Sequence, residues 1–223
     1  MKILCVSDHI DPLVYSPNIK KRFGHVEAIV GAGDLPLSYY DFIATNLNKP
    51  LLFVFGNHHL RGLSLYRHPS ALTQGPEGLS GYNPRLGGGG IYLDRRSVRI
   101  SGCIFAGLGG SMWYNGELNQ YSEIGMLFKM LALVPRLLWN RIRFGRFVDI
   151  LVTHSAPFGV GDKSDPCHTG FKGFLLFMRL FKPRFLLHGH IHLYDFNHVR
   201  ERTYHGTRVI NVYDHYVLST EDC

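Results

Sequence analysis

A pattern of short apolar segments, each stopping at an Asp, Asn or His, restricts the folds open to this sequence more than any other feature. Five segments end in this way, at Asp8, at Asp34, at Asn57-His58, at His154, and at His190 with His192. Apolar runs of this length, bounded by glycine and polar residues, predict buried strands. The carboxyl ends of parallel strands share one edge of a sheet, where α/β proteins place their sites. We therefore expect these distant residues to meet at that edge.

The segments between these strands favour an α/β fold. A helical pattern over residues 37–47 lies between the second and third strands, and short connections of this kind predict a parallel sheet. Residues 91–93, 98–100 and 103–106 are expected to form short antiparallel strands. Residues 122–144, with Pro135 as a kink or break, and residues 170–181 are expected to be helical. Further short strands are predicted at 202–204, 208–212 and 216–218. No linker is apparent, and 223 residues suffice for one sizeable core, so a single domain over 1–223 is predicted.

Cysteine usage and the chain start bear on the compartment. The four cysteines are far apart and have neither zinc-finger nor redox spacing. Cys5 and Cys103 lie in apolar runs and are predicted to be buried thiols, so a disulfide framework is not expected and a reducing compartment is favoured. The first residues do not resemble a signal peptide, and no apolar stretch is long enough to span a membrane. A cytoplasmic location is therefore expected.

The polar residues at the strand ends have the chemistry of metal ligands. Carboxylates together with imidazoles suit borderline divalent ions such as manganese, iron or zinc. Gly33, Gly56 and Gly189 stand beside them and permit tight backbone turns. A metal site built from Asp, Asn and His is the chemical prediction.

The same residues carry a resemblance to a known family. In this order, Gly33-Asp34, Gly56-Asn57-His58, the lone His154 and Gly189-His190-Ile191-His192 resemble the motifs of the calcineurin-like metallophosphoesterases, over roughly residues 1 to 218. The resemblance implies an α/β fold, specifically a four-layer α/β/β/α sandwich of two mixed sheets flanked by helices. It also implies two divalent metal ions, with manganese expected first and iron, zinc or nickel as alternatives.

The resemblance further implies a role for each matched residue. Asp34 would bridge the two ions, Asp8 and His192 would bind the first, and Asn57, His154 and His190 would bind the second. His58 would be the catalytic histidine, which contacts the phosphate and the leaving group. The expected activity is hydrolysis of phosphomonoesters or phosphodiesters by a hydroxide that the two metals activate.

One position departs from the family pattern. The family opens with Asp, any residue, then His, whereas this chain has Asp8-His9-Ile10-Asp11, and isoleucine cannot bind a metal. Asp11 is the predicted replacement ligand, because a carboxylate suits the same ions. The alternatives for this ligand position are His9, on a changed loop, and a water molecule. Asp11 could then serve only to cap the following segment. His59 stands where the family often has an acidic residue.

The positive charge, net +7, gathers in two apolar stretches. Residues 124–148 contain five basic side chains and no acid before Asp149, and residues 171–184 repeat the mixture of basic and large apolar residues. The first interpretation is a pair of helices, each with a buried apolar stripe and a solvated basic face. A peripheral membrane contact, with a lipid phosphoester as substrate, is the second. A nucleic-acid partner has no recognition motif to support it.

Two further segments could line a substrate site. The loop over residues 107–116 could do so through Trp113 and Tyr114, or could be a turn with a packed aromatic residue. His168 could approach the phosphate, or could serve a turn. Besides a phosphoesterase, the sequence leaves open a binding scaffold that kept the fold and lost catalysis, for which Ile10 is the main argument, and a nuclease. It does not predict the oligomeric state.

Overall fold

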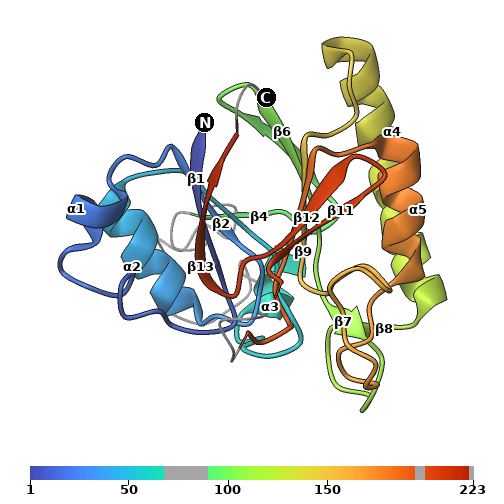
Figure 1. The fold of residues 1–223 in the computed structure, drawn as a ribbon, viewed down its shortest axis with the longest axis horizontal. Helices are drawn as coiled ribbons and strands as arrows, with labels where there is room; N and C mark the ends of the chain where they lie inside the picture. Colours follow the sequence, from blue (N-terminus) through green and yellow to red (C-terminus); the bar gives the residue numbers. More distant parts are fainter. Residues whose placement is uncertain (68–89, 194–198, 221–223) are drawn as a thin grey trace, which may run out of the picture.

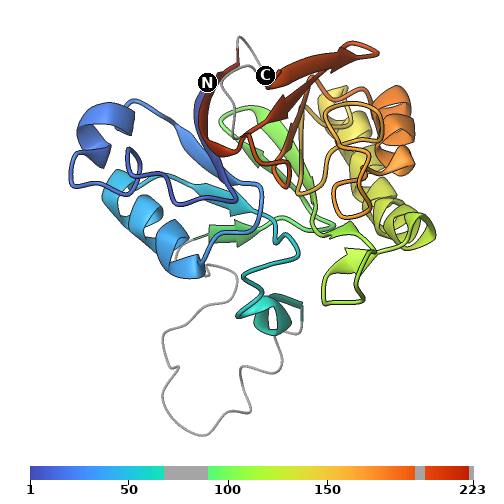
Figure 2. The same cartoon turned by 60° about the horizontal axis from the view of Figure 1, so that its bottom comes forward.

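The computed structural model describes residues 1–67, 90–193 and 199–220. Two β-sheets pack face to face, and helices cover both outer faces (Figure 1). Turning the molecule places α1 (Ile19–Phe23) and α2 (Leu37–Leu47) on one side and α4 (Glu123–Phe144) and α5 (Lys172–Phe181) on the other (Figure 2). The expected four-layer α/β/β/α sandwich is confirmed.

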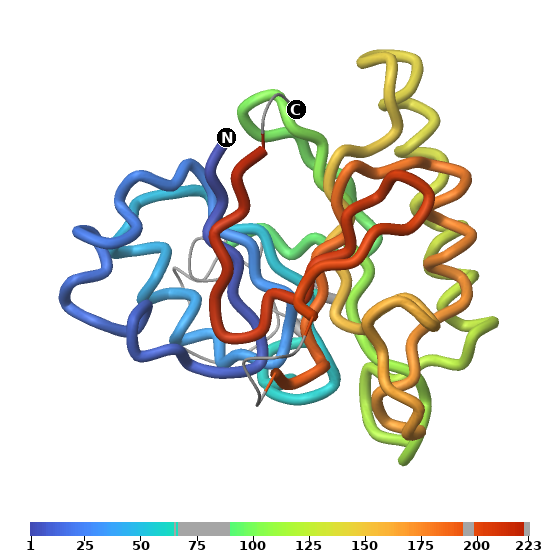
Figure 3. Tube along the Cα trace, viewed as in Figure 1, coloured from blue at the N-terminus to red at the C-terminus, as the bar shows by residue number. Residues whose placement is uncertain are grey.

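The first sheet has the strand order β13-β1-β2-β3-β4. Its four strands β1 to β4 are parallel, and β13 runs antiparallel to β1, so the first and last strands of the chain lie side by side (Figure 3). The bounds are β1 (Lys2–Ser7), β2 (Ala28–Gly31), β3 (Leu51–Phe53), β4 (Gly90–Tyr92) and β13 (Asp214–Ser219).

The second sheet has the order β11-β12-β10-β9-β6-β5. Its four inner strands are parallel, and the strands at both edges are antiparallel to their neighbours. The bounds are β5 (Ser97–Ile100), β6 (Cys103–Leu108), β9 (Ile150–Thr153), β10 (Phe185–His188), β11 (Glu201–Tyr204) and β12 (Thr207–Asn211). A separate pair, β7 (Ser111–Met112) and β8 (Gln120–Tyr121), and the short helix α3 (Leu63–Arg67) were not expected from the sequence, nor was α1.

Three apolar clusters separate the four layers. The middle cluster joins the inner faces of both sheets through residues such as Cys5, Val30, Phe105 and Leu187. Alternate residues of the same strands, such as Leu4 and Leu186, face the helices instead. Because both faces of these strands are buried, the strands are continuous apolar runs, and only their ends can carry polar residues.

In the middle of the chain, one predicted feature is wrong, and one of two alternatives expected for another is excluded. The strand over residues 91–93 was expected to be antiparallel to its successors, but β4 joins the first sheet parallel to β3, while β5 and β6 form the expected antiparallel pair in the second. Pro135 does not break the helix, since α4 runs from its Ser122 cap to Gly145. Pro135 and Leu131 lie on the exposed side of α4, where water can reach the carbonyl that proline leaves without a donor.

Cys103 was expected to be a free buried thiol but is part of a disulfide bond. Cys5 and Cys167 are free thiols, and Cys5 is buried as expected. The inference of a reducing compartment, which depended on free thiols, therefore loses part of its support. Among the described residues, no helix combines the length and apolar character that crossing a membrane requires.

Candidate metal centre

The carboxyl ends of strands from both sheets place a group of polar residues between the two sheets. Asp8 follows β1, His154 follows β9, and His190 lies two residues beyond β10. Asp8, Asp34 and His190 have φ angles of 64°, 56° and 67°, in the left-handed region that non-glycine residues seldom adopt. The chain thus turns sharply at these three residues. Backbone strain of this kind tends to gather at functional sites.

His154 is held with one ring nitrogen aimed at two oxygen atoms. Its Nδ1 lies 2.8 Å from the carbonyl oxygen of Ala32, so Nδ1 carries the hydrogen and donates it. Its Nε2 lies 3.2 Å from Asp34 Oδ2 and 3.1 Å from Asn57 Oδ1. An imidazole nitrogen facing a carboxylate and an amide oxygen, inside a fully buried site, requires a proton or a metal cation between them.

His190 completes the group. Its Nε2 lies 2.6 Å from the carbonyl oxygen of Cys167, which leaves Nδ1 as the nitrogen available to a metal. Three buried residues each place one ligand atom within 4.8 Å of the other two: Asp34, His154 and His190. Backbone carbonyls therefore orient both histidines, as second partners commonly do for metal-binding histidines.

Two glycines let the backbone approach the carboxylates. A Cβ atom on Gly56 would stand 2.1 Å from Asp34 Oδ1, and one on Gly189 would stand 1.9 Å from Ser7 Oγ and 2.3 Å from Asp8 Oδ2. No other residue fits at either place without moving a carboxylate or its hydrogen-bond partner. The glycines that the sequence places beside the ligands are thus explained by steric fit.

The electrostatics of the group are dominated by burial and by the Asp34–His154 pair. Burial raises the pKa of Asp8 to about 6, although the charge of His154 partly opposes this effect. Burial would also raise the pKa of Asp34, but the charge and hydrogen bond of His154 hold it well below its usual value. Burial disfavours a charged His154, yet Asp34 raises its pKa to about 9. Burial and the charge of His154 lower the pKa of His190 to about 3. A proton on His154 thus supplies positive charge that a divalent cation could supply instead.

Asn57 and His58 lie beside Asp34 at the end of the β3 segment. Asn57 is buried and its Nδ2 donates to the hydroxyl of Tyr114 at 3.1 Å, so the loop containing Tyr114 reaches the centre, whereas Trp113 is 61% exposed. The backbone amide of His58 donates to Asp34 Oδ1 at 2.8 Å, while its side chain is exposed. His59 is exposed as well.

Asn119 contributes a support that the sequence analysis missed. Its buried side chain donates to the carbonyl oxygens of Phe55 and Gly56, at 3.2 and 2.5 Å, and so fixes the turn that presents Asn57. Nothing in the local sequence distinguishes Asn119 from an ordinary loop residue, because its partner lies more than 60 positions earlier.

Neither Asp11 nor His9, the candidates for the place of Ile10, is among the described residues that gather around Asp34. Ile10 is 40% exposed, and His9 pairs with Asp214 at 2.7 Å. Asp11, the predicted replacement, accepts from the backbone amide of Leu13 at 2.7 Å through Oδ1 and pairs with His215 through Oδ2. Both oxygens of Asp11 are thus engaged away from Asp34, which matches the alternative in which Asp11 caps the following turn.

The two remaining predicted ligands lie at the edge of the centre. Asp8 accepts from Ser7 Oγ at 2.6 Å and from the backbone amide of His190 at 3.0 and 2.9 Å. His192 is half-buried, with its ring 5.0 Å from that of Tyr213. Burial, followed by the charge of His168, lowers its pKa.

The loop over residues 165–168 lies next to His190 at the candidate centre. His168 Nδ1 lies 2.7 Å from Asp165 Oδ1, and the rings of His168 and His190 are 5.3 Å apart. Cys167, whose carbonyl orients His190, directs its Sγ to the same Asp165 oxygen at 2.8 Å. His168 therefore lies next to the candidate ligands and is held by its own carboxylate.

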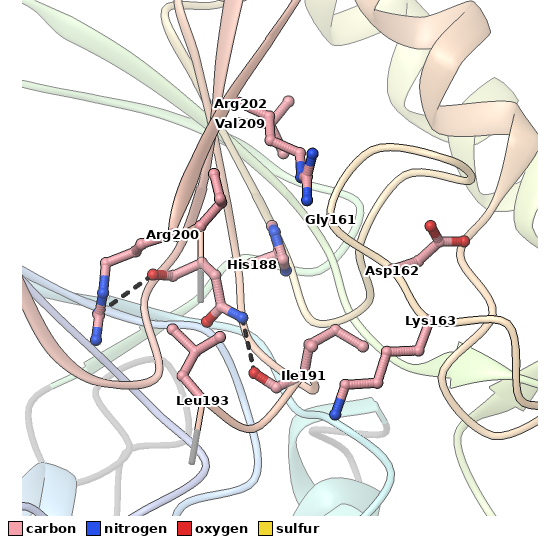
Figure 4. A pocket seen from close by; sticks show the side chains of 11 residues that line it. Gly161, Asp162, Lys163, His188, Ile191, Leu193, Arg200, Arg202 and Val209 are labelled. Carbon is pink, nitrogen blue, oxygen red and sulfur yellow. Dashed lines mark hydrogen bonds between the residues drawn. The ribbon is translucent and has the colours of Figure 1, made fainter. Parts of the chain in front are cut away.

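A cavity of about 140 Å³ adjoins the segment that carries His190 and His192 (Figure 4). The imidazole of His188 points into it, beside Gly161 and Ile191. The guanidinium of Arg200 turns away and donates to three backbone carbonyls, including that of Tyr213 at 3.0 Å. The cavity therefore lies against the segment bearing two predicted ligands.

Comparison with known proteins bears on the fold. No protein-family model and no curated protein matches the sequence. Several solved structures are similar, and one of them has a TM-score of 0.64 at 12% identity and covers 96% of this chain and 90% of its own. Another, TT1561 of Thermus thermophilus, has a TM-score of 0.61 at 14% identity and covers 96% of this chain and 89% of its own. At such identities the likeness extends to the fold alone.

Proposed function

We propose that this protein is a metal-dependent phosphoesterase that uses two divalent ions. The observation that carries the proposal is the arrangement around His154, whose Nε2 lies 3.2 Å from Asp34 Oδ2 and 3.1 Å from Asn57 Oδ1, with His190 beside it. Buried carboxylate and imidazole ligand atoms this close together suit a divalent cation.

The residues fit the two ions unequally. Asp34, Asn57, His154 and His190 offer four ligands to one ion. Backbone carbonyls hold the two histidines, the amide of His58 holds Asp34, and the hydroxyl of Tyr114 holds Asn57. Asp8, Asp34 and His192 would hold the other, and among the described residues no side chain takes the place of Ile10. The first ion would therefore bind more weakly than the second. Manganese is the leading candidate for both, since mixed carboxylate and imidazole ligands suit it.

The chemistry assigns roles to this chain's own residues. Two divalent ions, when bound, supply an activated water and a clamp for the phosphoryl oxygens. Asp34 would be shared by both ions, and its carboxylate is anchored by the amide of His58. The exposed imidazole of His58 would hold or deliver a proton at the leaving oxygen. Tyr114 would orient the Asn57 amide through its hydroxyl.

Hydrolysis of model esters tests the proposal. Chelator-treated protein would be assayed with bis-p-nitrophenyl phosphate and p-nitrophenyl phosphate, with and without added manganese. We expect turnover only with metal, and the preferred ester separates a diesterase from a monoesterase. Metal bound at the site without turnover of either ester would favour the scaffold interpretation.

The matched variants are His154→Asn and His205→Asn. His205 is an exposed histidine in the turn between β11 and β12, away from the candidate ligands. Loss of both metal and activity in the first variant, with both retained in the second, is the expected pair of results.

A further inference from the structure

Helix α4 has two apolar faces rather than one. The inner face, with Met126, Leu133 and Leu137, is buried against the second sheet and α5. The opposite face carries a second row of apolar residues with spacings of four and three, which places them on one line along the helix. We call this row the outer stripe: Ile124, Phe128, Leu131, Pro135, Leu138 and Ile142.

The outer stripe is open to solvent along the whole helix. Exposed fractions are 66% for Ile124, 67% for Phe128, 62% for Leu131 and 79% for Ile142. Trp139, at the border of the stripe, is 61% exposed. Soluble proteins seldom leave a continuous apolar surface uncovered unless it meets a partner. The sequence-based expectation of one buried stripe and one solvated basic face therefore describes only part of this helix.

Basic side chains border the outer stripe. Arg136, Arg141 and Arg143 on α4 are exposed. On the neighbouring helix, α5 and the residues after it add four exposed basic side chains: Lys172, Arg179, Lys182 and Arg184. Glu123 is the one acid within α4 and α5, and it accepts from the backbone amide of Gly173 at 2.5 Å. The surface is thus apolar along its centre and positive at its margins.

We propose that the outer stripe of α4 lies on an anionic lipid bilayer. An amphipathic helix with Trp, Phe and Leu on one face and arginines at its borders binds in the interface between headgroups and acyl chains. The arginines would attract anionic headgroups, and the apolar side chains would enter the outer acyl region. Its place as part of the outer helical layer leaves α4 accessible to a flat surface (Figure 1, Figure 2).

Charge favours a bilayer over a second copy of the chain. Two α4 helices packed through their outer stripes would bring Arg136 and Arg141 of both copies to the same seam, where α4 itself offers no acid beyond Glu123 at its start. Like charges along such a seam oppose pairing. An anionic surface instead neutralises every one of these charges. The inference rests on α4 and α5 alone and does not depend on the proposed phosphoesterase activity.

Vesicle sedimentation tests the proposal. The full chain would be mixed with vesicles of phosphatidylcholine, or of phosphatidylcholine with about a quarter phosphatidylglycerol. We expect the protein to bind the anionic vesicles, with an affinity that falls as salt is raised. Its affinity for the neutral vesicles should be at least about tenfold lower, because several basic residues each contribute to the attraction for anionic headgroups.

Matched variants assign the binding to the stripe. Leu138→Gln should weaken binding by roughly fivefold, and Arg141→Glu by at least about tenfold. Leu13→Gln and Lys21→Glu are the controls, since Leu13 is 48% exposed, close to the 50% of Leu138, and Lys21 is an exposed lysine on α1. All four positions are solvent-exposed, so the variants should fold.

Three results would overturn the proposal. One is the absence of binding to anionic vesicles at low salt. Another is binding that the Leu138→Gln and Arg141→Glu variants retain in full. The third is a dimer in solution that Leu138→Gln converts to a monomer, because the stripe would then be covered by a second copy.

Discussion

At the scale of single residues, the candidate centre depends on how each histidine is held. Ala32 and Cys167 present carbonyl oxygens to His154 and His190, and this choice of partner decides which nitrogen of each ring faces inward. His58 differs from both, because its backbone amide rather than its ring contacts Asp34. The proposed function therefore gives the three histidines separable roles, two as ligands and one as a group facing the substrate.

Replacing His58 tests that separation. His58→Ala leaves its amide bond to Asp34 intact, so we expect the bound metal to be unchanged. Loss of a positioned proton donor should reduce the turnover number by about 10²–10⁴-fold. Metal content and turnover would be measured on one preparation. Undiminished turnover at equal metal content would exclude His58 from the chemistry.

Proton release tests the state of His154. Its pKa of about 9 means that the ring is protonated at neutral pH, whereas His190, with a pKa of about 3, is already neutral. A metal must displace the proton on Nε2 of His154. We therefore expect manganese affinity to rise by up to about tenfold per pH unit from about pH 6.5 to about pH 8.5.

Calorimetry in buffers of different ionisation enthalpy would count the protons released. About one proton per tightly bound ion is expected near pH 7. Binding without proton release, and with a flat pH dependence, would mean that His154 is not a ligand.

At the scale of the elements, the sequence predicted most strands and the three longer helices from periodicity. It also predicted that polar strand ends would converge, and Asp34, Asn57, His154 and His190 do lie together. Apolar runs with a polar end are a strong local signal, because a strand buried on both faces can be polar only where it leaves the sheet.

What the sequence could not predict were contacts between distant segments. Strand β4 was predicted to pair with the wrong strands, because no local sequence pattern shows which strands become neighbours in a sheet. Asp11 was expected as a ligand, but its carboxylate pairs with His215, some 200 residues later. The outer stripe of α4 was interpreted as part of an ordinary amphipathic helix, because sequence alone does not say which of two apolar faces the core covers.

Lys129 shows how α4 is tied to both sheets. Its buried ammonium lies 2.8 Å from Asp94 Oδ1, in the segment after β4, and donates to the carbonyl of Gly109, after β6, at 2.6 Å. The same Asp94 oxygen accepts from the amide of Gly109 at 2.8 Å. One cation thus links the first sheet, the second sheet and the outer helical layer.

Removing that cation should be costly. Lys129→Met leaves a buried carboxylate with Arg95, at 3.3 Å, as its remaining cation, and we expect the free energy of unfolding to fall by about 3 kcal/mol. Urea unfolding of the variant would measure the change. Lys172→Met, on the exposed start of α5, is the control and should change stability by less than about 0.5 kcal/mol. Equal stability of the two variants would contradict the assigned role of Lys129.

At the scale of the whole molecule, the candidate centre exists only because two sheets meet. Asp8, Asp34 and Asn57 come from the first sheet, and His154, His190 and His192 from the second. The four-layer packing brings them together, and solved structures such as TT1561 of Thermus thermophilus are similar in fold. Under the proposed function, Ile10 would make the two ions unequal, with four ligands for one ion and a poorer set for the other.

Turnover measured against metal occupancy tests whether activity requires both ions. Metal-depleted protein would be titrated with manganese, with bound ions and hydrolysis of bis-p-nitrophenyl phosphate and p-nitrophenyl phosphate determined on the same samples. We predict a tight first equivalent that gives little turnover, and activity that rises as a weaker second ion binds. Full activity with a single ion, or two bound ions with no turnover of either ester, would contradict the two-ion phosphoesterase proposal.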